Sequence, residues 1–452
     1  MGVPVVRGWQ DTKTKGSNNM GSLVIALALL MIGMPIGLAF ALVIILGNAH
    51  WDLAGYTLGE LPFDVIILSP LIAIPLFILV GELMNRSGLT RSIVELASFT
   101  LYRLKAKLGY VLILASGLMG AITGSSVATV AAMGGTLGAE MRKRKYPAEY
   151  AAALNAATGL LGVFIPPSIP LILYGSIVEV SIKKLFLASM LPGLLCLIGF
   201  ACVHMWRSKR LPTESMDAEP AKQGMGSSNQ QSLVGGVKKW KIMRDLPALA
   251  LPVLVLGSIY GGIATPTEAA GVAALYALLI TFMRVETPIK QSIQGLNGAV
   301  MVGAAILTII AFTSILNRAL VLEQWPQAIA AGTVALTDNP LVFLLIVNAI
   351  LLLIGMFMET NAATMLMGPL LAPAAHAYGI DPVQFGVLLV MNIEIGLITP
   401  PLAVNIYVAQ KINSANLLPM LKELIPFFCV TSMVLIAVTF FDPLTTWYRY
   451  LD

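Results

Sequence analysis

Two short stretches interrupt long apolar runs in the same way: Gly162-Val-Phe-Ile-Pro166-Pro167 and Gly396-Leu-Ile-Thr399-Pro400-Pro401. Paired prolines remove two backbone N–H donors and stop the preceding helix. Inside a membrane the freed carbonyl groups need a partner, which a bound cation can supply. A simple kink is the alternative, because Pro and Gly are common in membrane helices. The second stretch begins 234 residues after the first, which favours a repeated broken helix.

The composition around these stretches is that of a membrane protein. Of 452 residues, 57% are hydrophobic and only 11% charged, and the mean hydropathy is +0.85. Soluble domains carry about 25% charged residues. This excludes a soluble enzyme, a disordered chain and a disulfide scaffold, and it predicts an all-α polytopic membrane protein. Cys196, Cys202 and Cys429 lie in apolar runs, so we expect small buried side chains and not disulfide partners.

Three apolar runs, 108–140, 147–182 and 340–378, are too long for one simple helix. The run 108–140 would form a helix of about 50 Å, against a hydrocarbon core of about 30 Å. Its centre is glycine-rich, Gly117-Leu-Met-Gly-Ala-Ile-Thr-Gly-Ser-Ser126, and Lys and Arg cluster on both flanks. Both flanks are therefore expected in the cytoplasm, which predicts a re-entrant helical hairpin. The run 340–378 predicts a second hairpin, and its flanks lack Lys and Arg, so it opens to the outside.

The basic residues set the expected topology. With the N-terminus in the cytoplasm and the C-terminus in the periplasm, 24 of the 28 Lys and Arg residues fall on the cytoplasmic side. We read the basic patches as topology signals that contact anionic membrane lipids, and not as a nucleic-acid surface. Residues 1–19 are either a native tail or an extension upstream of Met20. We expect a polar cytoplasmic tail 1–20, followed by a first repeat 21–206 that contains hairpin 108–140 and broken helix 147–182. A cytoplasmic loop 207–245 and a linking span 246–262 lead to a second repeat 263–441, with hairpin 340–378 and broken helix 383–410. The chain ends in a periplasmic tail 442–452.

The two halves match in register. Ser125-Ser126-Val-Ala-Thr129 corresponds to Thr360-Asn361-Ala-Ala-Thr364 at an offset of 235, as Pro147 does to Pro382. Because the hairpins are expected to open on opposite sides, the repeat is predicted to be inverted. Inverted repeats with broken helices are typical of secondary transporters, whose binding site lies near the midplane.

The hairpin tips predict an anion site. Gly124 permits a turn, Ser125 and Ser126 can cap the returning helix, and the second tip has Glu359 in the equivalent place. Two helix N-termini aimed at one point attract an anion, and no Lys or Arg lies at that depth. The expected substrate-binding residues are Ser125, Ser126, Thr129, Pro167, Thr360, Asn361, Thr364 and Pro401.

We also expect about two Na⁺ sites, each formed by a hairpin tip and the adjacent Gly-to-Pro loop. The candidate ligands are Ser125, Ser126, Gly162 and Pro166 in the first repeat, and Thr360, Gly396, Thr399 and Pro400 in the second. Glu359 either takes part in cation binding or proton coupling, or caps a helix or faces water. Glu394 is a second coupling candidate, expected to accept backbone hydrogen bonds from the nearby loop.

Missing motifs narrow the function further. The sequence contains no Gly-x-x-x-x-Gly-Lys-Ser/Thr phosphate loop, so no nucleotide is expected to drive the protein directly. It also lacks His-Glu-x-x-His and Gly-x-Ser-x-Gly, which weakens the hypothesis of a membrane-embedded enzyme.

Together these motifs resemble the large membrane subunit of TRAP (tripartite ATP-independent periplasmic) transporters, over roughly residues 20–441. The resemblance rests on Pro75-Leu-Phe-Ile-Leu-Val-Gly-Glu82, Gly124-Ser-Ser-x-Ala-Thr129, Gly162-x-x-Ile-Pro-Pro-Ser168, Gly261-Gly-Ile-Ala-Thr-Pro-Thr-Glu268 and Gly396-Leu-Ile-Thr-Pro-Pro401. The hairpin tips also look like the Ser-Asn-Thr motif of divalent-anion/sodium symporters, although Ser126 stands where that motif has Asn.

The resemblance implies Na⁺-coupled uptake of organic acids, such as C4-dicarboxylates or sialic acid, across the bacterial inner membrane by an elevator movement. It implies two partners, a periplasmic substrate-binding protein and a small membrane subunit of about four helices on a separate chain. A stand-alone symporter or Na⁺/H⁺ antiporter is the alternative transporter, and a structural membrane subunit or membrane enzyme is the alternative from another class.

Overall fold

The computed structural model describes residues 28–29, 34–51, 55–101, 104, 106–209 and 250–450. The expected tail 1–20 and most of the loop 207–245 lie outside these residues. Every regular element within the described ranges is a helix, which confirms the all-α fold class.

The helices fall into two series separated by the part of the chain that is not described. The first series is α2 (Ile36–Trp51), α3 (Gly55–Gly59), α4 (Leu61–Ile66), α5 (Ser69–Arg86), α6 (Leu89–Thr100), α7 (Lys107–Thr123), α8 (Ser126–Lys143), α9 (Ala148–Gly159), α10 (Leu161–Phe164), α11 (Ile169–Ile177) and α12 (Ile182–Ser208). The second series is α15 (Leu251–Tyr260), α16 (Pro266–Arg284), α17 (Pro288–Leu322), α18 (Trp325–Leu336), α19 (Pro340–Gly355), α20 (Thr360–Ala377), α21 (Pro382–Gly396), α22 (Val404–Asn413), α23 (Leu417–Phe440), α24 (Pro443–Thr446) and the 3₁₀ helix η1 (Trp447–Tyr450).

Several helices are long and apolar enough to cross a membrane. Five helical stretches in the described residues meet this condition by length and composition, with the kinked stretch 148–177 taken as one. The number rises to six if α5 and α6, which bend by 72° at their junction, form one broken span. The chain is therefore a multi-pass membrane protein. The helices on either side of each predicted hairpin tip are 16 to 18 residues long.

Glycine and proline end helices at the positions that the sequence indicates. The chain turns between α7 and α8 at Gly124, whose φ of 60° is readily adopted only by glycine. α10 ends at Phe164, just before Pro166-Pro167, and α21 ends at Gly396, just before Pro400-Pro401. The peptide bond between the two prolines is cis in both breaks.

The helix boundaries recur between the two series. Six helices of the second series begin between 233 and 236 residues after their counterparts in the first. These pairs are α6 and α18, α7 and α19, α8 and α20, α9 and α21, α11 and α22, and α12 and α23. The offset agrees with the spacing of the sequence motifs, so the two halves share one succession of helices.

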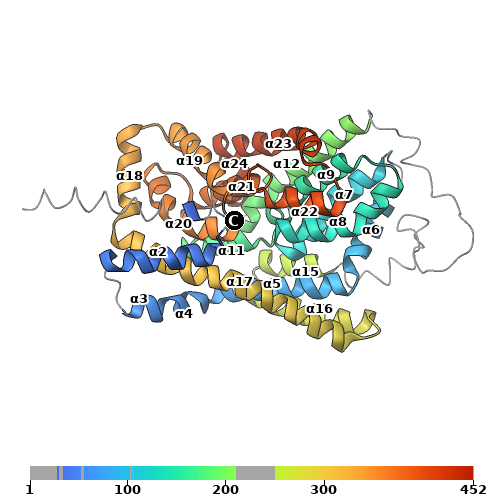
Figure 1. The fold of residues 1–452 in the computed structure, drawn as a ribbon, viewed down its shortest axis with the longest axis horizontal. Helices are drawn as coiled ribbons and strands as arrows, with labels where there is room; N and C mark the ends of the chain where they lie inside the picture. Colours follow the sequence, from blue (N-terminus) through green and yellow to red (C-terminus); the bar gives the residue numbers. More distant parts are fainter. Residues whose placement is uncertain are drawn as a thin grey trace, which may run out of the picture.

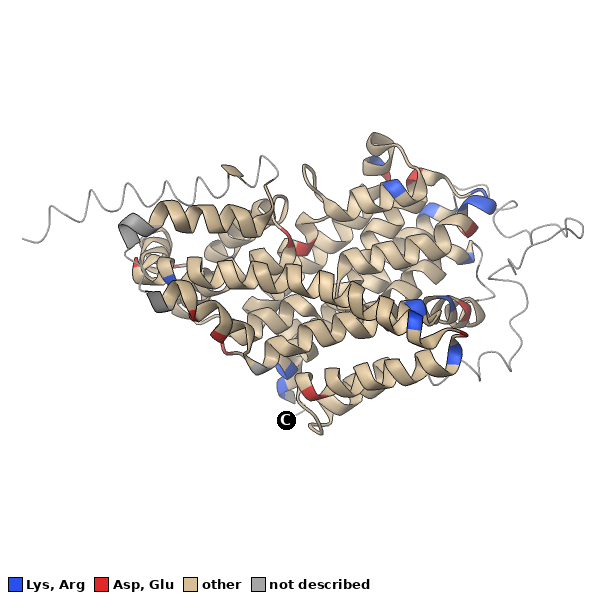
Figure 2. Ribbon diagram, turned by 60° about the horizontal axis from the view of Figure 1, so that its bottom comes forward, with Lys and Arg blue, Asp and Glu red and all other residues tan. Residues whose placement is uncertain are grey.

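The helices are arranged around the two hairpins. α5 packs against α16 and α17, whereas α12 packs against α23 on the opposite side of Figure 1. The hairpins and broken helices lie between these layers. Figure 2 shows most Lys and Arg gathered at one end of the molecule, whereas charged residues are few in its middle, where an acidic segment lies.

Two expectations need correction. Cys196 is buried, but Cys202 and Cys429 are exposed on the surfaces of α12 and α23. Their apolar sequence context reflects an apolar helix surface and not a packed interior. The helices α6 and α18 were not predicted, because each has only 12 residues and membrane spans are recognised as long apolar runs.

Candidate functional site

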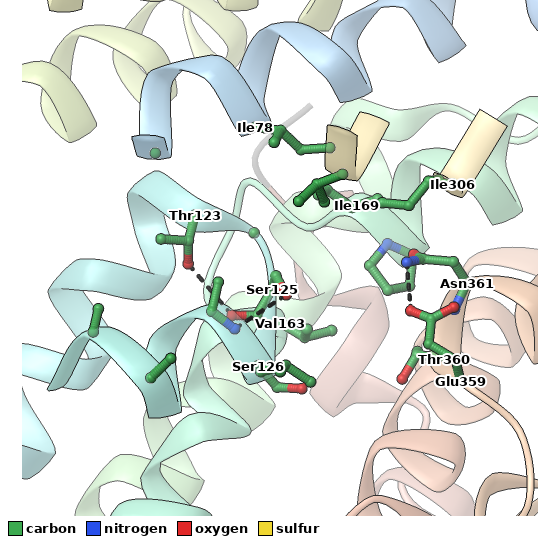
Figure 3. A pocket seen from close by; sticks show the side chains of 18 of the residues that line it. Ile78, Thr123, Ser125, Ser126, Val163, Ile169, Ile306, Glu359, Thr360 and Asn361 are labelled. Carbon is green, nitrogen blue, oxygen red and sulfur yellow. Dashed lines mark hydrogen bonds between the residues drawn. The ribbon is translucent and has the colours of Figure 1, made fainter. Parts of the chain in front are cut away.

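A cavity of about 310 Å³ lies between the two hairpin tips. The start of α8 forms one wall and the start of α20 the facing wall, and α5 and α17 contribute side chains (Figure 3). The polar residues around it are Glu82, Asn85, Thr123, Ser125, Ser126, Glu359, Thr360, Asn361 and Glu394. The lining contains carboxyl, hydroxyl and amide groups, but neither Lys nor Arg.

The first tip is uncharged. Ser125 caps α8, but its hydroxyl accepts only one backbone hydrogen bond, from the Ala128 N–H at 3.5 Å. Ser126 and Val127, whose N–H groups begin the helix and have no intrahelical acceptor, line the cavity. Thr129 supports the turn from behind, donating to the Ser125 carbonyl at 2.9 Å. This wall therefore presents hydrogen-bond donors and the positive end of a helix dipole.

The second tip carries a carboxylate in the capping position. Glu359 accepts hydrogen bonds from the N–H groups of Asn361 and Ala362 at 3.0 and 3.3 Å. It also accepts one from the side-chain amide of Asn361 at 2.6 Å, drawn in Figure 3. Among the alternatives for Glu359, the structure shows the helix cap. Two of the first-turn N–H groups of α20, those of Asn361 and Ala362, are thus occupied by the protein's own carboxylate.

Glu394 connects the second tip to the broken helix behind it. Its Oε1 accepts a hydrogen bond from the Thr360 hydroxyl at 2.8 Å, and Ser126 of the first tip faces the same carboxyl group. Only 1% of the Glu394 surface is exposed, and its Oε2 has no hydrogen-bond partner. The expected bonds to loop backbone are replaced by this contact with the tip, because the side chain points toward the cavity.

Close backbone contacts fix the position of each tip relative to its broken helix. A Cβ added to Gly120 would lie 2.6 Å from the Leu161 carbonyl oxygen. In the second half, a Cβ on Gly355 would lie 2.6 Å from the carbonyl oxygen of Ile393. No side chain fits at either point, so the glycines let the hairpin and broken helix meet backbone to backbone. Gly120 and Gly355 are 235 residues apart, so they are a further pair of equivalent residues in the two halves.

The structure brings some predicted site residues to the cavity and leaves others behind it. Ser125, Ser126, Thr360, Asn361, Glu359 and Glu394 line it. Gly162 lies close behind the first tip, since a Cβ there would be 2.7 Å from the Ser125 carbonyl oxygen. The remaining candidates, which do not line the cavity, are Thr129, Thr364, Pro166, Pro167, Gly396, Thr399, Pro400 and Pro401. Thr364 is fully buried and its hydroxyl has no hydrogen-bond partner.

Helices α5 and α17 supply lining residues that sequence reasoning missed. Glu82 and Asn85 come from α5, while Val302 and Ile306 come from α17. Glu82 forms an ion pair with Arg86 at 3.4 Å. The signal in the sequence was an acidic residue at the end of an apolar run, which is a functional hypothesis by default in a membrane protein.

The comparisons with known proteins agree on one family. The family model described as tripartite ATP-independent periplasmic transporter, DctM component, matches residues 23–444. The chain is 32% identical to the sialic acid TRAP transporter large permease protein SiaM of Vibrio cholerae, covering 94% of this chain and 97% of that protein. It is 34% identical to the C4-dicarboxylate TRAP transporter large permease protein DctM of Pseudomonas aeruginosa, over 82% and 84% of the two chains.

A longer relative and a solved structure extend the comparison. The chain is 34% identical to the isethionate TRAP transporter permease protein DctMQ of Oleidesulfovibrio alaskensis, and the match covers 91% of this chain but only 63% of that protein. The crystal structure of the YdaH transporter of Alcanivorax borkumensis has a similar fold, with a TM-score of 0.57 at 15% identity over 87% of this chain and 88% of that one. The chain therefore belongs to the DctM family of tripartite ATP-independent periplasmic transporters, as a membrane permease subunit and not an enzyme.

Proposed function

We propose that the chain is the large permease subunit of a Na⁺-coupled importer of organic acids. The observation that carries this proposal is the cavity of about 310 Å³ between two hairpin tips from different halves of the chain. Relatives are named for C4-dicarboxylate, sialic acid and isethionate. All three are small organic anions, so the substrate class is a small organic acid.

The acidic charge of the cavity is the reason to include Na⁺ in the proposal. Glu359 and Glu394 line it, and among the described residues neither forms an ion pair with Lys or Arg. An anion would bind poorly beside uncompensated carboxylates in a medium of low dielectric constant. Na⁺ would offset this charge, and its oxygen ligands would come from the tips and the Gly-to-Pro loops. The unpartnered Thr364 hydroxyl is a suitable donor atom behind the second tip.

Transport would follow from an inverted repeat that moves as an elevator. The recurring helix boundaries and equivalent glycine contacts support two copies of one structural unit. In this proposal the hairpins and broken helices move together, carrying the cavity past a framework that includes α5 and α17. The backbone contact at Gly120 and its counterpart at Gly355 would keep each hairpin attached to its broken helix during the movement.

The proposal also includes two partner proteins and the orientation of the chain in the membrane. A periplasmic binding protein would deliver the acid, and a small membrane subunit of about four helices would pack against the framework. The chain would sit in the bacterial inner membrane with its N-terminus in the cytoplasm and its C-terminus in the periplasm. Coupling would involve Glu394 and Glu359, with Na⁺ ligands at both tips.

Reconstitution in liposomes tests the proposal. The chain, a candidate small subunit and a candidate binding protein would be combined, and uptake of a labelled organic acid measured with and without a Na⁺ gradient. We expect uptake only when Na⁺ and the binding protein are both present. Uptake that needs Na⁺ but not the binding protein would favour the stand-alone symporter, and uptake that needs neither would overturn the proposal.

A further inference from the structure

The two walls of the cavity have opposite hydrogen-bonding character. We propose that the cavity binds an acid in one orientation, with its carboxylate at the first hairpin tip and a hydroxyl group at the second. The preferred substrates are then hydroxy acids, including sugar acids, over dicarboxylates of the same chain length. This inference rests on the proposed function and names the substrate class of the same site.

The first tip provides the carboxylate end. Ser126 and Val127 begin α8 and line the cavity, so their N–H groups are placed to donate to an anion. The Ser125 hydroxyl accepts one long hydrogen bond and can still donate its own proton to a ligand. No acidic side chain lies on this tip. A carboxylate here would meet the open backbone N–H groups at the start of α8, with the Glu394 carboxyl group also facing Ser126.

The second tip cannot bind a carboxylate in the same way. Its equivalent N–H groups already donate to Glu359. A substrate carboxylate would therefore meet a carboxylate at the helix start, where two of the first three N–H groups already have an acceptor. Like charges placed this close in a poorly hydrated cavity repel each other strongly. The helix dipole that attracts an anion at the first tip is already compensated at the second.

Asn361 shows which ligand group the second tip accepts. Its side-chain nitrogen donates to Glu359 at 2.6 Å, which fixes the amide orientation, because the reverse orientation would bring two acceptors together. Its oxygen is left without a partner, although the residue is 93% buried and lines the cavity. An unpartnered buried oxygen costs stability unless a ligand donates to it. A substrate hydroxyl is such a donor.

Glu394 lies between the two tips. Its Oε1 is bonded to Thr360, its carboxyl group also faces Ser126, and the residue is 99% buried and lines the cavity. The open acceptor that belongs to the second tip alone is therefore the Asn361 oxygen. The proposed Na⁺ ions would offset part of the acidic charge, but the N–H groups at the second tip would still be occupied by Glu359 and those of Ser126 and Val127 would still be open.

Acids of matched length test the inference. The full-length chain in lipid nanodiscs, without binding protein, would be titrated in Na⁺ with 4-hydroxybutyrate against succinate and with gluconate against adipate. We expect each hydroxy acid to bind at least about tenfold more tightly than the dicarboxylate of equal carbon number. Equal binding, or tighter binding of the dicarboxylates, would overturn the inference. Binding of no acid in Na⁺ would overturn the proposed function and the inference together.

Variants locate the origin of the preference. Glu359→Gln keeps the shape of the cap but removes its charge, so we expect succinate to bind about tenfold better relative to 4-hydroxybutyrate than in the wild type. Ser125→Ala is the matched control at the first tip, where both acids place a carboxylate, and it should weaken both equally. An unchanged ratio in Glu359→Gln would contradict the assignment. If that variant does not fold, the wild-type preference still decides the question.

Discussion

The two hairpin tips occupy equivalent positions in the two halves, yet their helices begin differently. α8 follows a glycine turn and is capped by one long hydrogen bond from Ala128 to Ser125. α20 is capped by Glu359, which accepts two backbone bonds and one from Asn361. The shared plan places two helix starts around one cavity. Because the caps differ, the start of α8 offers hydrogen-bond donors and the start of α20 offers acceptors. Two similar backbones thus form a cavity whose two ends differ chemically.

What the two tips share lies behind them. In each half, a glycine of the hairpin meets the backbone of the broken helix at Gly120 and at Gly355. The contact depends on the absence of a side chain, whereas the cap depends on which side chain is present. Substitutions of these two kinds should therefore have different consequences.

The largest effect is expected at the backbone contacts. In Gly396→Ala the new Cβ would lie 2.6 Å from the Gly355 carbonyl oxygen, and in Gly162→Ala 2.7 Å from that of Ser125. Because backbone cannot move aside cheaply, each variant should lose about 3 kcal/mol of stability. Thermal unfolding in detergent would measure this. Gly135→Ala on α8, with nothing within 4 Å of the new Cβ, is the control and should be near neutral; equal losses in all three would refute the packing explanation.

Removing a threonine hydroxyl should destabilise the protein more at the second tip than at the first. Thr360→Val removes the donor to Glu394 and leaves its buried carboxyl group facing only Ser126, which should cost about 2 kcal/mol. Thr129→Val removes the bonds to the Ser125 carbonyl and to the Thr123 hydroxyl, but Thr123 keeps its bond to the Met119 carbonyl, so the cost should be about 1 kcal/mol. Chemical unfolding compares the two, and Thr360→Ser should restore most of the loss. A larger cost at Thr129 would reverse the proposed ranking.

Removing the helix caps should cost less stability, and the cost should again be larger at the second tip than at the first. Glu359→Ala removes three hydrogen bonds, at an expected cost of about 1.5 kcal/mol. Ser125→Ala removes one bond of 3.5 Å and should cost about 0.5 kcal/mol. The same unfolding assay measures both variants. Equal losses would mean that Ser125 caps its helix as firmly as Glu359 does.

The smallest effects concern Na⁺. Ser126→Ala should raise the Na⁺ concentration for half-maximal substrate binding about threefold, or about 0.7 kcal/mol. Thr399→Ala should raise it by less, about twofold, because Thr399 does not line the cavity and its hydroxyl donates to the Ile395 carbonyl. Na⁺ titrations at fixed substrate would show the shifts. Unchanged Na⁺ dependence in both would favour simple helix kinks.

Features set by single residues were predictable from the sequence. The turn at Gly124 and the helix ends before Pro166 and Pro400 follow from local backbone restrictions. The Thr265 to Glu268 capping box at the start of α16 is likewise a local pattern. Such signals act within a few residues, and so they survive without knowledge of the tertiary structure.

Features that depend on packing were not predictable in the same way. The contribution of Glu82 to the cavity depends on where α5 packs, and the bond from Thr360 to Glu394 joins residues 34 positions apart. The exposure of Cys202 depends on which face of α12 is covered. For Glu359, the helix cap could be recognised only from the side-chain geometry, because a glutamate at a hairpin tip suits both a cap and a coupling group.

A cryo-electron microscopy structure of the full-length chain in nanodiscs with Na⁺ and gluconate would test the polarised cavity. We predict density for the acid between the tips, with its carboxylate beside the N–H groups of Ser126 and Val127 and its hydroxyl groups beside Asn361 and Glu394. A carboxylate placed against Glu359 and Asn361, or an acid bound outside this cavity, would contradict the assignment of the two tips.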